Sequence, residues 1–241
     1  MSTSTLRGLA RVGRRSTRVA RLLDRRHERG QRKWLRKMAE RDRRLLEELS
    51  LRRDLQLNVG SSSSYLEDWV NCDLFRDPEG RCLQMDVAKR WPFPDASAVT
   101  VNSEHLIEHL TQEGVRACLR EASRVLGPQG VIRTSTPDLG GLCGAHREAN
   151  PETLERHRSH GYEAATFGDL VNNYFYSWGH RHIYDFETLT LLLSEAGFEQ
   201  IERASYGQSR HTALRGIDRH DPQGLESLVL IVDAVKPMSR Q

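Results

Sequence analysis

A helix, a tight turn and a buried strand follow one another around Glu121–Leu139, and this stretch constrains the fold more than any other. Thr111 is the predicted N-cap of the helix, because its hydroxyl can accept a hydrogen bond from the first turn. Gly127–Gly130 cannot continue a helix, and the β-branched residues of Val131–Thr136 predict a strand. The helix has one apolar face with i, i+3, i+4, i+7 spacing, made of Val115, Cys118, Leu119, Ala122, Val125 and Leu126.

Helix and strand patterns alternate on both sides of this stretch. Asp185 is the predicted cap of a later helix, which Gly197 ends. Such alternation predicts a doubly wound α/β sheet, which binds ligands at the carboxyl ends of its strands. The other predicted strands are Asp54–Val59, Trp69–Leu74, Ala98–Asn102, Phe198–Tyr206 and Leu228–Val235.

The charge is distributed unevenly along the 241 residues. Residues 1–54 hold 18 Lys and Arg against 7 Asp and Glu, a net charge of +11, and the remainder holds 18 against 26, a net charge of −8. Apolar residues recur at helical spacing within the basic part, whereas proline is missing from it. We therefore predict a basic amphipathic helical extension over residues 1–52 and one α/β domain over residues 53–241.

The extension is compatible with several roles. Its thin apolar stripe could pack on the domain or on a second copy of the chain, and a basic amphipathic helix also suits an anionic membrane surface. Nucleic acid is a less favoured partner, because the segment has one aromatic residue and no recognised binding motif. The first 23 residues also have the acid-free, Arg-, Ser- and Thr-rich composition of an organellar transit peptide.

The cysteine spacing and the hydropathy of the sequence indicate in which cellular compartment the protein is expected. The four cysteines have no C-x-x-C spacing, so buried free thiols are favoured over a disulfide framework. No apolar run approaches the roughly 20 residues that span a bilayer. The expected location is cytoplasmic, with peripheral membrane contact through the extension as one alternative.

Four segments in order, "LNVGSSSSYLEDWVNCDL", "VNSEHLIEHL", "EASRVLGPQGVIRTSTPDL" and "YDFETLTLLLSEAGF", resemble the class I S-adenosylmethionine-dependent methyltransferases. The resemblance covers about Leu55–Val235. It implies a Rossmann-like, mostly parallel sheet with an antiparallel last strand, and S-adenosyl-L-methionine as cofactor. It also implies O- or N-methylation of a small molecule or a glycan.

The resemblance assigns a cofactor site. Gly60–Ser62 would be the turn that the methionine part of the cofactor approaches, Asp73 would accept hydrogen bonds from the ribose, and Asp86 with Val87 would border the adenine. The family turn is normally G-x-G, and a serine at the second glycine position costs about 1 kcal/mol if its φ is positive. A catalytically degenerate interaction module is therefore the alternative interpretation. The complete predicted set is Asn58, Gly60, Ser61, Ser62, Asp73, Leu74, Asp86, Val87, Ser103 and Glu104.

His105, His182 and Asp138 are the predicted catalytic residues. His105 would lie beside the methyl group and act as a base, His182 is the second candidate, and Asp138 would line the substrate side. His109 and His180 are expected to be structural.

The run His105–His109 also matches H-x-x-E-H, a zinc-hydrolase signature. No downstream glutamate helix is identifiable, so a zinc hydrolase is the third alternative and no metal site is predicted.

The segment Gly140–Tyr184 is long for a connection between a strand and a helix, which suggests a lid or a substrate wall. It contains a charged helical piece, Pro151–His160, and a group of aromatic residues. These rings could stack on an acceptor or pack a small core of the segment itself. They are Phe167, Tyr174, Phe175, Tyr176 and Trp178.

Overall fold

The computed structural model describes residues 36–220 and 224–238, and the chain divides into two units between Glu47 and Glu48. The predicted helix of the extension is present from residue 36 to residue 50, and residues 1–35 lie outside the described part. Within the first unit, Glu40 pairs with Arg43 at 2.8 Å and with Arg44 at 3.0 Å, which is the i, i+3 and i, i+4 spacing that supports an exposed helix.

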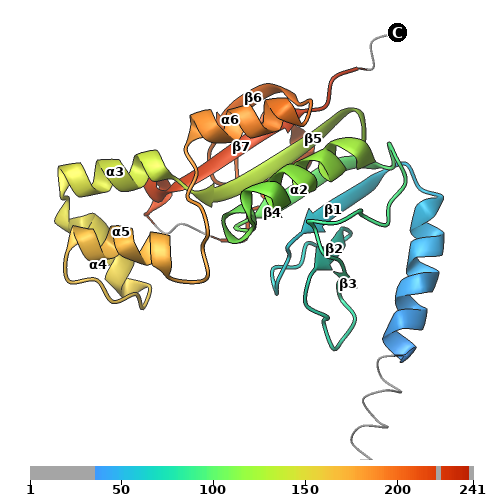
Figure 1. Ribbon diagram of the computed structural model, residues 1–241, viewed down its shortest axis with the longest axis horizontal. Coiled ribbons are helices and arrows are strands. Elements are labelled where there is room, and N and C mark those ends of the chain that lie inside the picture. The colour runs from blue at the N-terminus through green and yellow to red at the C-terminus, as the bar shows by residue number, and fades with distance from the viewer. Residues whose placement is uncertain (1–35, 221–223, 239–241) are drawn as a thin grey trace, which may run out of the picture. The chain divides into compact units, whose positions relative to one another are not determined.

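The second unit is built on a seven-stranded sheet with the order β3-β2-β1-β4-β5-β7-β6 (Figure 1). All the strand pairs from β3 to β5 are parallel, and β7 is antiparallel to both of its neighbours. This confirms the predicted mostly parallel sheet with an antiparallel last strand. The two-residue β3 was not predicted. The strands are β1 (Leu55–Val59), β2 (Val70–Asp73), β3 (Leu83–Gln84), β4 (Ala98–Glu104), β5 (Leu126–Pro137), β6 (Glu199–Ala204) and β7 (Val229–Val235).

Two capped helices, α2 (Gln112–Val125) and α6 (Phe186–Glu195), lie on one face of the sheet (Figure 1). The Thr111 hydroxyl accepts the N–H of Gly114 at 3.1 Å, and the Asp185 carboxylate accepts the N–H of Thr188 at 2.8 Å. Both predicted N-caps are therefore confirmed.

The predicted turn Gly127–Gly130 lies inside β5, which begins at Leu126 and not at Val131. Between the pairs Ala98–Leu126 and Thr100–Val131, one residue of β4 lies opposite four of β5, so the turn bulges out of the ladder. Gln129 has a φ of +64° there, and a Cβ on Gly130 would lie 2.9 Å from the Gly127 carbonyl oxygen. The turn prediction was right locally, but the strand continues past it.

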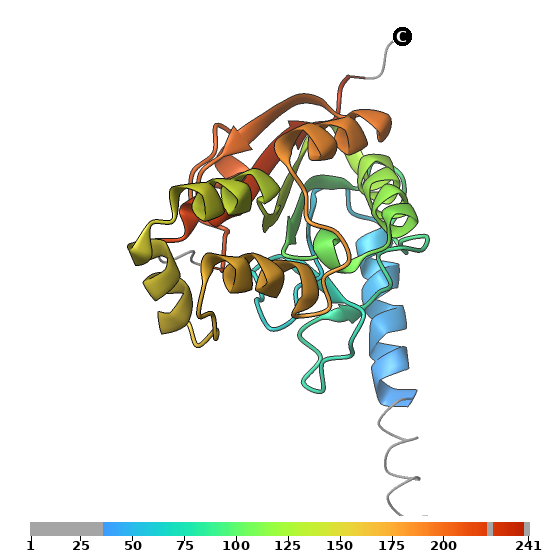
Figure 2. The same ribbon diagram turned by 60° about the vertical axis from the view of Figure 1, so that its left-hand side comes forward.

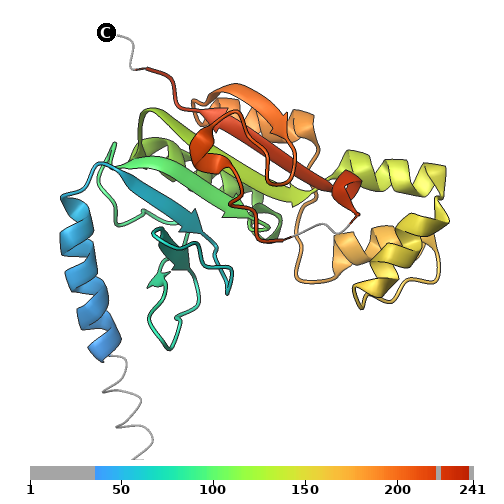
Figure 3. The same cartoon turned by 180° about the vertical axis from the view of Figure 1, so that it is seen from behind.

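The segment between β6 and β7 covers the opposite face of the sheet (Figure 3). A buried arginine connects this segment to β5. The Arg133 side chain is fully buried and donates to both carboxylate oxygens of Asp233 on β7, at 2.8 and 2.9 Å. It also donates to Asp218 at 2.7 Å, and Asp218 accepts the N–H of Gly207 at 2.8 Å. The loop between β6 and β7 is thereby fixed to the centre of the sheet.

The long segment after β5 forms three helices that gather beyond one end of the sheet (Figure 2). They are α3 (Leu139–Glu148), α4 (Pro151–Ser159) and α5 (Phe167–Tyr176), so the predicted helical piece Pro151–His160 is confirmed as α4. These helices share their own apolar core, to which Leu225 and Leu228 also contribute. Gly141 allows the close approach, because a Cβ at this position would lie 1.7 Å from the Ser227 carbonyl oxygen.

The four cysteines are free thiols, and Cys143 is the exposed one. Among the described residues, no helix is both long enough and apolar enough to cross a bilayer.

We predict that Arg133→Ala lowers the free energy of unfolding by about 3–5 kcal/mol, because it leaves two buried carboxylates without their cation. Chemical denaturation monitored by circular dichroism measures the change. The matched control is Arg116→Ala, whose pair with Glu195 at 3.0 Å is exposed, and whose expected cost is below about 1 kcal/mol. Equal costs for the two variants would contradict a structural role for the buried pair.

Candidate functional site

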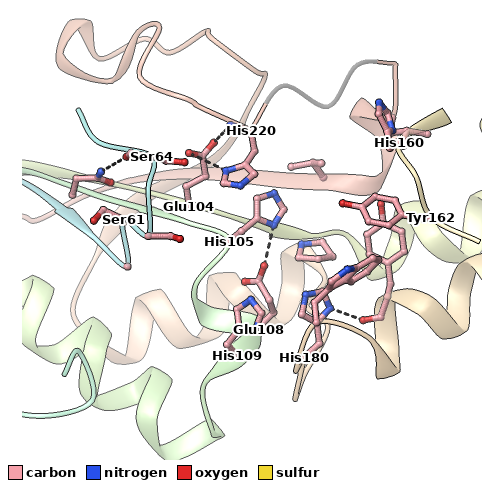
Figure 4. A pocket seen from close by; sticks show the side chains of 18 residues that line it. Ser61, Ser64, Glu104, His105, Glu108, His109, His160, Tyr162, His180 and His220 are labelled. Atoms are coloured by element: carbon pink, nitrogen blue, oxygen red, sulfur yellow. Dashed lines mark hydrogen bonds and ion pairs between the residues drawn. The ribbon is translucent and has the colours of Figure 1, made fainter. Parts of the chain in front are cut away.

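A cavity of about 570 Å³ opens at the carboxyl ends of β1 and β4, where the strand order of the sheet reverses (Figure 4). This is the position at which doubly wound sheets bind ligands. Its wall combines the loop after β1, the loop after β4, the inserted helices and the region before β7. The main lining residues are Gly60, Ser61, Ser62, Glu104, His105, Glu108, His109, Pro137, His160, Tyr162, Tyr174, Trp178, His180 and His220.

The loop after β1 has the backbone shape of a glycine-rich turn. Gly60 has a φ of +70°, and a Cβ there would lie 2.6 Å from Cδ1 of Leu106. Ser62 has a φ of +46° and therefore adopts the left-handed conformation at the position of the second family glycine. Its N–H donates to Oδ2 of Asp73 at 2.8 Å, which offsets part of the conformational cost.

Asn58 lines the cavity, but its side-chain amide is already occupied. Its Nδ2 donates to the Ser64 carbonyl and to Oδ1 of Asn71, both at 2.9 Å, and its Oδ1 accepts Nδ2 of Asn102 at 3.0 Å. These bonds join β1 to both neighbouring strands and to the loop. The geometry thus gives Asn58 a role in shaping the site.

Glu104, at the end of β4, binds the connection between β6 and β7, which crosses the sheet. Its Oε1 accepts the backbone N–H groups of Arg219 and His220, both at 2.9 Å, and its Oε2 lies 3.4 Å from Nδ1 of His220. Burial alone would raise the pKa of Glu104, but the His220 side chain and the two N–H groups lower it overall. The same contact raises the pKa of His220.

His105 occupies the centre of the cavity wall in a strained conformation, with a φ of +48°. Its Nδ1 lies 2.9 Å from Oε1 of Glu108, and the Thr136 hydroxyl donates to the other oxygen of Glu108 at 3.2 Å. The Glu108 side chain is fully buried. A buried carboxylate therefore orients the His105 ring toward the cavity.

The segment Ile107–His109 is a short 3-10 helix (η1), so His105 and His109 do not share the face of an α-helix. The geometry of a zinc-hydrolase helix is therefore not formed. Instead, the His109 ring meets the His180 ring edge to face at 4.9 Å, and Nδ1 of His180 lies 2.6 Å from the Tyr174 carbonyl oxygen. Burial lowers the pKa of His180.

Three aromatic rings of the inserted segment complete the wall. Trp178 contacts Tyr162 at a centroid distance of 4.8 Å and Tyr174 at 5.6 Å. Phe167 packs into the core of the insertion, whereas the Phe175 and Tyr176 side chains are exposed. The predicted aromatic group is thus divided between the cavity, the local core and the surface.

Several predicted residues do not line the cavity. Asp73 binds the N–H groups of Ser62 and Phe75, both at 2.8 Å. Asp138 caps α3 and pairs with Arg203 at 2.9 Å. The other residues outside the lining are Leu74, which is exposed, Val87 and Ser103, which are buried, Asp86, which pairs with Lys89, and His182, whose ring packs on Tyr184.

The structure adds residues to the site that sequence reasoning did not assign to it. Glu108, His109 and His180 come together here, and His160, Tyr162 and His220 join them in the lining. The available signal was the number of histidines, because the cavity holds five of the ten in the chain. Their spacing along the sequence does not indicate that they meet.

A family model described as a methyltransferase domain matches residues 61–134, from the loop after β1 into β5. Among curated proteins, no sequence matches the chain.

Several solved structures resemble the chain at low identity. An S-adenosylmethionine-dependent methyltransferase from Archaeoglobus fulgidus is 15% identical, with 82% of this chain and 92% of that chain covered and a TM-score of 0.45. The N-methyltransferase NodS from Bradyrhizobium japonicum, in complex with S-adenosylhomocysteine, is 15% identical, with 83% and 87% covered and a TM-score of 0.44. A methyltransferase from Thermotoga maritima, a possible histamine N-methyltransferase by its description, is 15% identical, with 76% and 81% covered and a TM-score of 0.47.

The domain match begins at the cavity loop and contains β2 and β4, and the sheet is mostly parallel with the antiparallel last strand that the resemblance implied. Residues 61–134 therefore match a methyltransferase domain, and they lie within a sheet of the topology predicted from the resemblance to the class I S-adenosylmethionine-dependent methyltransferases.

Proposed function

We propose that this chain transfers a methyl group from S-adenosylmethionine to an oxygen or nitrogen atom of a small molecule or a glycan. The observation that carries the proposal is the continuity of the cavity. Its wall runs from the Gly60–Ser62 loop, past His105, to the aromatic rings around Trp178. A cofactor bound at the loop and an acceptor bound at the rings would meet beside His105.

The loop fits the methionine end of the cofactor. A Cβ on Gly60 would lie 2.6 Å from the Leu106 side chain at a φ of +70°, so the loop requires glycine at this position. The hydroxyl oxygen of Ser61, which lines the cavity, is buried without a hydrogen-bond partner in the described part of the chain, which leaves it available to a polar ligand. Asp73 keeps unused lone pairs on both oxygens for the ribose hydroxyls, since each accepts one N–H group.

When bound, the cofactor supplies an electrophilic methyl group on a sulfonium. The chain must then hold the acceptor atom in line with it and accept the proton that the acceptor loses. His105 suits the second task, because Glu108 fixes its Nδ1 and leaves Nε2 available to an acceptor.

The acceptor side favours a ligand with a flat ring or the apolar face of a sugar. Tyr162, Tyr174 and Trp178 present polar edges and aromatic faces to the same cavity. Burial raises the pKa of Tyr174 to about 12, so this ring keeps its hydroxyl proton at neutral pH.

The first prediction concerns cofactor binding. Isothermal titration of the wild-type chain with S-adenosylhomocysteine should give micromolar affinity. Gly60→Ala should abolish this binding, because the added Cβ would lie 2.6 Å from Leu106 at a φ of +70°. Asp73→Ala should weaken it at least about tenfold.

Gly144→Ala is the matched control, because no atom lies within 4 Å of a Cβ at that helical position. Its affinity should equal that of the wild-type chain. If the wild-type chain does not bind millimolar ligand, the family fold serves as an interaction module in this protein.

A second prediction concerns the base. His105→Ala should lower turnover about 100-fold or more while leaving the affinity for S-adenosylhomocysteine within about a factor of two. Turnover is measured with an acceptor that the wild-type chain methylates, and His146→Ala, at an exposed position of α3, is the control. Unchanged turnover in His105→Ala would remove this residue from the mechanism.

A third prediction concerns the pH dependence of the cavity wall. The pKa of His220 is raised above its ordinary value of 6.5, so its pair with Glu104 stabilises the fold fully below that pH. This contribution is lost as the pH rises through the raised pKa. The difference in melting temperature between wild type and His220→Ala should therefore be larger near pH 6 than near pH 9. Calorimetry at both pH values measures it, and a constant difference would contradict the pair.

A further inference from the structure

Glu108, His109 and His180 form a group of potential metal ligands inside the cavity. One ligand atom from each residue lies within 4.8 Å of the others. Two of these residues are neighbours after β4, and the third comes from the end of the inserted segment, so the insertion completes the group (Figure 4).

The charge of Glu108 is the first argument for a cation here. Its side chain is fully buried, and among the described residues no lysine or arginine pairs with it. An ionised carboxylate without a cation is costly in a buried position. A metal ion bound by Glu108 and the two histidines would place a positive charge directly beside this carboxylate.

The orientation of His180 is the second argument. The Tyr174 carbonyl oxygen lies 2.6 Å from Nδ1 of His180, and a carbonyl can only accept, so Nδ1 carries the proton. Nε2 therefore has its lone pair free. A backbone carbonyl behind a histidine is the usual outer contact of a metal-binding imidazole. The Thr136 hydroxyl gives Glu108 the corresponding outer contact at 3.2 Å.

We propose that Glu108, His109 and His180 bind one divalent transition-metal ion, of the kind that two imidazoles and one carboxylate select, such as Zn²⁺, Co²⁺, Mn²⁺ or Fe²⁺. Ligand distances of about 2.0–2.2 Å require the three side chains to draw together slightly around the ion. Mg²⁺ is disfavoured because it prefers oxygen ligands.

With three protein ligands, the ion keeps coordination positions that are open toward the cavity. The hydroxyl group of a methyl acceptor can occupy one of them. This step rests on the proposed function and makes the acceptor atom an oxygen. The ion lowers the pKa of the bound hydroxyl, whose proton passes to the His105 ring. The oxygen–carbon bond to the methyl group forms as the carbon–sulfur bond breaks, and the electron pair stays on sulfur, which becomes a neutral thioether.

The experiment is a titration of the purified full chain, stripped of metal with a chelator, with Co²⁺ monitored by visible absorption and with Zn²⁺ monitored by calorimetry. One ion per chain is expected. Glu108→Gln, His109→Ala and His180→Ala should each weaken binding at least about 100-fold, and Thr136→Val about tenfold. Acetohydroxamate, a small two-oxygen ligand, should shift the Co²⁺ bands if coordination positions are open.

His146→Ala is the control for adventitious binding by surface histidines, and circular dichroism identifies any variant that does not fold. His109→Ala and His180→Ala change half-buried residues, so they keep the test valid if Glu108→Gln unfolds. Metal binding that persists in both variants, or no binding by the wild-type chain, would overturn the site. Unshifted Co²⁺ bands would overturn the oxygen-acceptor step. Titration of the metal-free chain with S-adenosylhomocysteine tests the proposed function separately.

Discussion

The buried guanidinium of Arg133 is the interaction on which the rest of the site depends. It satisfies Asp233 on the neighbouring strand and Asp218 on the loop that crosses the sheet. Because each carboxylate would be costly to bury alone, the three groups stabilise one arrangement of strands and loop. The loop arrives at the far end of the sheet with His220 beside Glu104. One buried cation thus positions a wall of the cavity that it does not touch.

Two buried carboxylates then determine the chemistry of that cavity. Glu104 accepts two backbone N–H groups of the returning loop, whereas Glu108 contacts His105 and Thr136 and has a ligand atom each of His109 and His180 within 4.8 Å. Glu104 ends β4 and Glu108 follows four positions later, yet their surroundings differ completely. On the side of Glu104, a ligand in the cavity would therefore meet a carboxylate whose hydrogen bonds are already made. On the side of Glu108, it would meet a carboxylate whose surroundings favour a cation.

The sequence allowed the sheet, its capped helices and the turn at Gly60 to be predicted, because hydrophobic period, capping residues and glycine act locally. Arg133 could not be predicted as buried, since its partners lie 85 and 100 residues away. The meeting of His109 with His180 was missed for the same reason, as it depends on the path of the whole insertion. Asp73 and Asp138 stood at the expected strand ends, but their hydrogen bonds to the backbone depend on loop conformations that no local pattern specifies.

The separate apolar core of α3, α4 and α5 has a consequence for how the cavity can be altered. The aromatic wall and His180 come from one continuous stretch that folds largely on itself, with Leu225 and Leu228 as its contributions from elsewhere. Substitutions in that stretch can therefore change one wall of the cavity while the packing of the sheet and of the Gly60–Ser62 loop stays the same. Replacing the stretch as one piece is then a direct way to reshape the cavity without destabilising the sheet.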